Sequence, residues 1–122
     1  MNRYRFLLLA ALLVAGSAVA IGRDDAQLEL AQAINAVQSA ERDDAARYAA
    51  AELDEAHAML SSARQASDDR AWHDTAIYAE RAKVAGDLAS ARSRQQRAEA
   101  ATAEIERSVE TLRVQLSTGG VR

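Results

Sequence analysis

Two histidines are the first residues to consider, because an imidazole can bind a metal ion or transfer protons near neutral pH. His57 follows Asp54 by three positions, so on a helix the two side chains share one face and allow a metal-binding or acid–base pair. A di-iron centre in a helical bundle would need two Glu-x-x-His elements, and His73 has Arg70 at the matching place. The spacing therefore favours a solvated Asp54–His57 pair, with metal binding or catalysis as the alternative.

Other catalytic patterns are missing from the sequence. It has no Cys, which excludes a thiol nucleophile, a thiolate metal site and a disulfide framework. It has no G-x-S-x-G nucleophile motif and no Gly-rich phosphate loop. We therefore expect no catalytic site, no cofactor site, no metal site and no small-molecule substrate: the protein is predicted not to be an enzyme.

The composition predicts the elements that carry these residues. The 122 residues include no Pro, five Gly and 30 Ala, and aromatic residues make up only 4% of the chain. Ala, Glu, Arg, Gln and Leu favour helices, and little is left that favours strands. We predict an all-α fold, either a long antiparallel helical hairpin or an elongated three-helix bundle with coiled-coil character.

Apolar periodicity divides the chain into three helical segments. The first runs from about Asp25 to Ala40, with Asp24 or Asp25 as its N-cap, and the second from about Ala45 to Ser67, with Asp43 or Asp44 as its N-cap. Their apolar stripes are Leu30, Ile34 and Val37 in the first and Leu53, Ala56, Leu60 and Ala63 in the second. A kink or short turn at residues 41–44 is favoured, with one continuous helix as the alternative, and capping residues at 67–69 predict a second break.

The third segment begins at Trp72 and ends near Gly119. Apolar or small residues recur in it at every seventh position, and a second series lies four residues later: Ile77, Val84, Ala91, Ala98, Ile105 and Leu112, then Arg81, Leu88, Gln95, Thr102, Val109 and Leu116. Six heptad steps predict a helix of about 45 residues and close to 70 Å. Either the first two segments line it together, or its C-terminal third overhangs.

The four large apolar residues near the end of this helix are the predicted contact surface. They are Ile105, Val109, Leu112 and Leu116, called the C-terminal seam below. The rest of the chain offers only weak apolar stretches for them to pack against, so we expect them to bind a protein partner, with self-association as the simplest outcome.

The aromatic residues Tyr48, Trp72 and Tyr78 are predicted to cluster at the hairpin end, where Ala cannot fill space; a ligand-stacking or partner patch is the alternative.

Residues 21–70 carry a net charge of −6 and residues 71–97 a net charge of +2, which favours packing of the third segment against the first two. The run Arg92–Arg97 is expected to be solvated or paired within the chain, with contact to anionic lipopolysaccharide or cell wall as the alternative.

The first twenty residues have the layout of a Sec signal peptide. Arg3 and Arg5 precede an apolar run, and Ala18 and Ala20 satisfy the A-x-A cleavage rule, so cleavage would leave Ile21 first. The apolar run is shorter than the ~20 residues that span a bilayer, although an uncleaved signal segment is the alternative and would be the only membrane contact expected.

Two further features bear on location and partners. Leu13–Ser17 is similar to a bacterial lipobox, but Ser17 occupies the position of the lipidated Cys, and a hydroxyl cannot accept the lipid. We therefore expect a periplasmic protein that is not a lipoprotein. Without residues 1–20 the net charge is −5, which disfavours nucleic acid as a partner.

The second segment carries a family resemblance. Tyr48–Leu53, followed by Ala56, Leu60, Ala63 and Ala66, resembles the Y-A-P-x-E-L-x-x-A-x-x-x-L-x-x-A-x-x-A signature of the domain of unknown function 4398, and residues 78–82 resemble its x-A-E-x-A element. Ala50 stands where the family has Pro. The resemblance covers roughly residues 28–101 and implies a short, Ala-rich, exported envelope protein; members are commonly lipoproteins and are sometimes joined to a peptidoglycan-binding domain.

The domain prediction is a signal peptide at 1–20, a single α-helical domain at 21–118 and a flexible tail at 119–122. The predicted function is that of a non-enzymatic periplasmic protein acting through protein contacts at the bacterial envelope. The alternative is a small periplasmic holdase or adaptor that binds outer-membrane or peptidoglycan-associated proteins.

Overall fold

The computed structural model describes residues 20–120, which form four helices and no strand. The helices are α1 (Arg23–Arg42), α2 (Ala45–Tyr48), α3 (Ala50–Asp68) and α4 (Trp72–Gly119). The all-α prediction is confirmed. None of the helices in this range combines the length and the hydropathy of a membrane-spanning segment.

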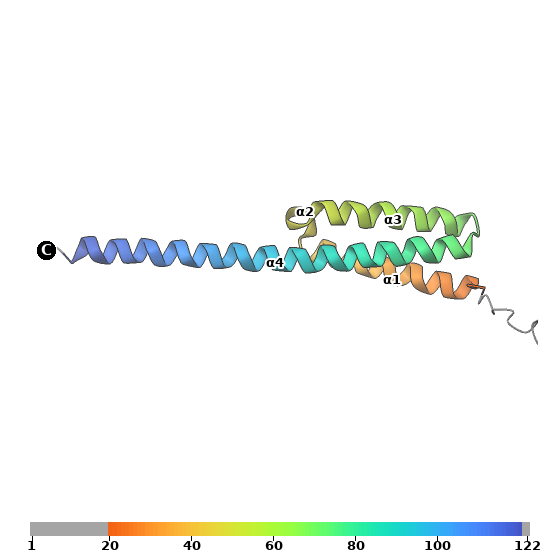
Figure 1. Ribbon diagram of the computed structural model, residues 1–122, viewed down its shortest axis with the longest axis horizontal. Coiled ribbons are helices and arrows are strands. Elements are labelled where there is room, and N and C mark those ends of the chain that lie inside the picture. The colour runs from red at the N-terminus through yellow and green to blue at the C-terminus, as the bar shows by residue number, and fades with distance from the viewer. Residues whose placement is uncertain (1–19, 121–122) are drawn as a thin grey trace, which may run out of the picture.

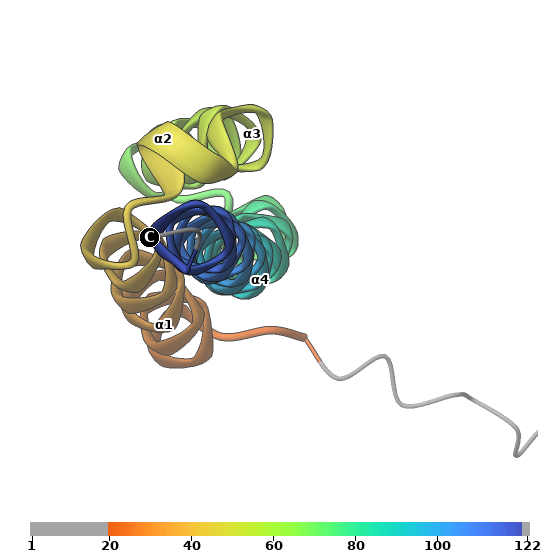
Figure 2. The same cartoon turned by 90° about the vertical axis from the view of Figure 1, so that its left-hand side faces the viewer.

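The three longer helices form an elongated bundle from which α4 projects. α1 and α3 lie beside the first half of α4, and the C-terminal half of α4 extends beyond them (Figure 1). Seen along the long axis, α1, α3 and α4 occupy the corners of a triangle (Figure 2). Of the two arrangements that the length of the third segment allowed, the structure has the one in which α4 overhangs.

The core consists mostly of alanine methyl groups. Among the buried apolar residues of the range 20–120, only Leu30, Val37, Leu53 and Leu60 are larger than Ala. The predicted stripe of the second segment is buried completely, whereas Ile34 of the first segment is half-buried. A core of small side chains lets helices approach closely but removes little apolar surface per residue from water.

The connection from α1 to α3 contains two breaks. The predicted turn after α1 places Asp44 in the left-handed conformation, with φ 62°. The second break, at Ala49 with φ −148° and ψ 46°, divides the predicted second segment and was not foreseen. α3 then begins at Ala50, the position at which the resembled family has Pro, and Pro suits the first residue of a helix.

The turn from α3 to α4 lies where the capping residues predicted it. The amide of Ala71 donates to the Ala66 carbonyl at 2.9 Å and that of Arg70 donates to the Ser67 carbonyl at 3.0 Å. These two bonds form a Schellman motif, with Arg70 at φ 58° in the place usually taken by Gly. The N-cap of α1, by contrast, is Gly22 rather than Asp24 or Asp25, which lie in its first turn, where carboxylates favour the positive end of the helix dipole.

Some predicted features lie at or beyond the ends of the described range. α4 includes Gly119, so the helix continues one residue into the predicted tail. Ser17 and Ala18 lie outside the described residues, and Ala20 is exposed.

Candidate interaction surface

The first half of α4 packs through a stripe of small residues. Their spacing alternates between four and three, and the stripe consists of Thr75, Ala79, Ala82, Gly86, Ala89 and Ser93, all buried. Val84 and Leu88, which belong to the two predicted heptad series of the third segment, are 60% and 44% exposed. The heptad pattern of the large residues therefore does not mark the face that packs in the bundle; that face is the small-residue stripe on the other side of α4.

Gly86 marks a close approach between the backbones of α1 and α4. A Cβ built there would lie 3.0 Å from the Ala36 carbonyl carbon and 3.0 Å from the Val37 nitrogen. These are backbone atoms, which cannot move aside without shifting α1. Gly86 therefore sets the distance between the two helices.

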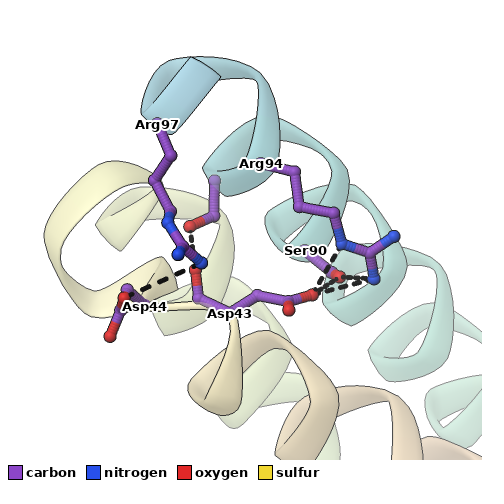
Figure 3. A network of polar contacts seen from close by, with 6 residues as sticks. Asp43, Asp44, Ser90, Arg94 and Arg97 are labelled. Atoms are coloured by element: carbon purple, nitrogen blue, oxygen red, sulfur yellow. Dashed lines mark hydrogen bonds and ion pairs between the residues drawn. The ribbon is translucent and has the colours of Figure 1, made fainter. Parts of the chain in front are cut away.

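A polar cluster holds the α1–α2 turn against α4 at the point where the bundle ends (Figure 3). The Asp43 carboxylate accepts hydrogen bonds from the Ser90 hydroxyl and from Arg94 Nε, the latter at 2.9 Å. The Ser93 hydroxyl donates to the Asp43 carbonyl oxygen, and Arg97 lies 3.9 Å from the Asp44 carboxylate. The hydrogen bond from Ser90, with that from Arg94, holds the pKa of Asp43 below its usual value of 3.8.

The predicted attraction between oppositely charged segments takes the form of specific pairs. Arg92 pairs with Glu52 of α3, while Arg94 and Arg97 pair with the two aspartates after α1. The three arginines of the Arg92–Arg97 run are thus each paired within the chain, which was one of the arrangements expected for this run.

Beyond the polar cluster, α4 is unsupported by the rest of the described chain. Ser93 is the last buried residue, and every residue from 94 to 120 is exposed. The projecting 94–119 section is about 40 Å long at 1.5 Å per residue. The C-terminal seam lies on it, with Ile105 64%, Val109 50%, Leu112 58% and Leu116 76% exposed.

The structure does not bring the predicted aromatic cluster together. Tyr48 is the last residue of α2, which forms part of the connection from α1 to α3. Trp72 is the first residue of α4 and lies at the opposite end of the bundle (Figure 1). Tyr48 stacks with Arg47 and Trp72 with Arg23, at 5.1 and 5.9 Å from guanidinium carbon to ring centroid. Tyr78 is half-buried against the core. The prediction of one cluster was wrong because α2 and the α3–α4 turn lie at opposite ends of α3.

His57 pairs with a residue other than the one its spacing suggested. Its Nε2 lies 2.9 Å from Glu41 Oε1, so it links α3 to the end of α1, and both side chains are about half exposed. Across residues 20–120, no group of three or more His, Asp or Glu side chains is arranged to hold a metal ion.

Sequence reasoning missed the residues that set the boundary of the bundle. Ser90, Ser93 and Gly86 carry no hydrophobic signal, yet together with Ala79, Ala82 and Ala89 they occupy the packed face of α4. A search for small residues at heptad spacing would have found that face.

Comparison with known proteins gives one match. A family model described as a domain of unknown function, DUF4398, matches residues 28–105, more than half of the chain. No significant match was found among curated proteins or among solved structures. The matched range begins within α1, covers the rest of the bundle and ends at Ile105, so the other three seam residues lie beyond it.

Proposed function

The chain belongs to the DUF4398 family, and from that premise we propose that it is a non-enzymatic protein of the periplasm that acts through protein contacts at the cell envelope. The layout of residues 1–20 supports export, and the position of Ser17 supports a form without a lipid anchor. The proposed contact surface is the C-terminal seam.

One observation carries this proposal: four large apolar side chains lie exposed along one side of a helix that has left its bundle. Exposed apolar surface of this kind marks protein-binding sites, because its burial against a partner is favourable. Val114 is also exposed but lies on another side of α4, so the stripe is one-sided.

The test is crosslinking in cells with the tagged protein, followed by identification of the bound species by mass spectrometry. We expect specific crosslinked species that disappear in the Ile105→Asp, Leu112→Asp variant. The matched control is Ala103→Asp, Val114→Asp, which adds the same charge on the opposite face of the same helix and should keep the crosslinks. Crosslinks that survive the seam substitutions would contradict the proposal.

A small holdase or adaptor is the second candidate, favoured by one groove between α3 and α4. The groove is lined by the half-buried Met59, the buried Ala85 and the exposed Val84 and Leu88. Flexible Met and exposed aliphatic side chains suit loosely specific apolar clients. Suppressed aggregation of a denatured porin, lost in Leu88→Asp, would support this function. No suppression at molar excess would eliminate it.

A further inference from the structure

We propose that the partner of the C-terminal seam is a second copy of the chain, bound antiparallel through residues 102–119 of α4. This inference rests on the proposed function, because it identifies what binds the same seam. Its basis is the placement of apolar and charged residues along the exposed helix.

The seam has the spacing of a coiled-coil surface. Ile105 and Leu112 occupy one heptad position, and Val109 and Leu116 occupy the other, so the steps alternate between four and three. In an antiparallel pair, Ile105 faces Leu116 of the second copy and Val109 faces Leu112 of the second copy. The twofold axis repeats both contacts, so each large seam residue meets another large apolar residue.

The charges beside the seam select this arrangement. Glu106 and Arg113 flank it at the same heptad position, one heptad apart. In the antiparallel pair described above, Glu106 of each copy faces Arg113 of the other, which gives two ion pairs. Within the described residues, Arg113 pairs with Glu110 at 3.3 Å, with both side chains largely exposed, so little holds it in that geometry.

Other arrangements lose these pairs. In a parallel pair in register, Glu106 would face Ala101 and Arg113 would face Ser108, neither of which is charged. A shift of the antiparallel pair by one heptad would bring Glu106 against Glu106 of the other copy in one direction, or Arg113 against Arg113 in the other, and both repel. Charge thus specifies both direction and register.

The bundles leave room for such a pair. The overlap ends at Thr102, and the last residue of α4 that is buried in its own bundle is Ser93. An antiparallel pair therefore places one bundle beyond each end of the overlap, where neither contacts the other helix.

Sedimentation equilibrium on residues 21–122 tests the pairing, with helicity checked by circular dichroism in each variant. We expect a reversible dimer whose dissociation constant rises about tenfold in Glu106→Arg and in Arg113→Glu, where attraction becomes repulsion. The double variant Glu106→Arg, Arg113→Glu restores the attraction with reversed polarity and should bind like the wild type. Equal dimerisation in all four proteins would overturn the antiparallel register.

Engineered cysteines provide a second test, because the sequence has none of its own. A mixture of Val109→Cys and Leu112→Cys proteins should form a mixed disulfide, whereas each alone should form far less. Disulfides formed by each variant alone would indicate a parallel pair and overturn the inference. A chain that remains monomeric, while seam-dependent crosslinks to a different protein persist in cells, would overturn this inference and leave the proposed function standing.

Discussion

Gly86 is a residue at which α4 lies directly against the backbone of α1. We predict that Gly86→Ala destabilises the bundle by about 1–3 kcal/mol, because the added methyl group meets the α1 backbone at 3.0 Å and overpacks the contact. Thermal unfolding followed by circular dichroism measures this. Gly119→Ala is the matched control, since a Cβ there would meet no other part of the described chain within 4 Å beyond its neighbours and the local helix backbone. An unchanged or higher midpoint for Gly86→Ala would show that α1 moves aside easily.

Asp43 makes the bundle sensitive to acid. Its pKa lies below the usual 3.8 because the Ser90 hydroxyl and Arg94 donate hydrogen bonds to the carboxylate. The ionised form is therefore favoured by folding, so this contribution to stability is present at neutral pH and is lost as pH falls below about 3.8. Asp43→Asn should lower the unfolding midpoint at pH 7 relative to wild type, and the difference should shrink as the pH is lowered.

The control for this prediction is Asp54→Asn, which makes the same chemical change at an exposed position on α3. It should leave the midpoint at pH 7 close to that of the wild type. A difference between wild type and Asp43→Asn that stays constant down to pH 2 would contradict the assigned role of the carboxylate.

At the scale of the element, α4 is one continuous helix that packs in the bundle up to Ser93 and is exposed from residue 94 to residue 120. We predict that ending the chain after Arg97 changes the stability of the bundle by less than about 0.5 kcal/mol, because residues 98–120 are all exposed. Unfolding is measured at low micromolar concentration, so that association adds no stability. Ending the chain after Gly86 instead removes Ala89, Ser90 and Ser93, and should unfold the bundle. A large loss of stability when the chain ends after Arg97 would contradict the independence of the projection.

The helices could be predicted from the sequence where the apolar pattern and the packing coincide. Leu53, Ala56, Leu60 and Ala63 are both the periodic residues of α3 and its buried face. In α4 the apolar pattern and the packed face differ. Size and hydrophobicity predict that Val84 and Leu88 are buried, whereas the residues that pack against the other helices include Ala82, Gly86 and Ala89. Small residues give closer contact between backbones, a gain that a scale of side-chain hydrophobicity does not count.

The candidate site likewise contains residues that could be predicted from the sequence and residues that could not. The seam residues could be named from the sequence because they are large, periodic and far from any second apolar stripe. The polar cluster could not, because Asp43 and Ser90 come together only through the α1–α2 turn, and no spacing along the chain relates them. Tyr48 and Trp72 show the opposite error: they were predicted to lie together at one hairpin end, but they lie at opposite ends of the bundle (Figure 1).

At the scale of the whole molecule, the projection makes the protein far from compact. α4 has 48 residues and is about 72 Å long, so the monomer should have a radius of gyration of roughly 20 Å. A compact domain of about 100 residues would have about 13 Å. Small-angle X-ray scattering at low concentration measures this, and a value near 13 Å would show that the end of α4 folds back onto the bundle.

Because a single uninterrupted helix joins the bundle to the seam, the direction in which the seam faces is set by counting residues between Arg97 and Ile105. Each residue inserted there advances the seam by 1.5 Å and turns it by about 100°, so one extra residue would aim it at a different side of the molecule. Seven extra residues would carry it about 10 Å further and return it to within about 20° of its original direction. Insertions or deletions of seven residues in this helix should therefore be tolerated, whereas those of a single residue should not.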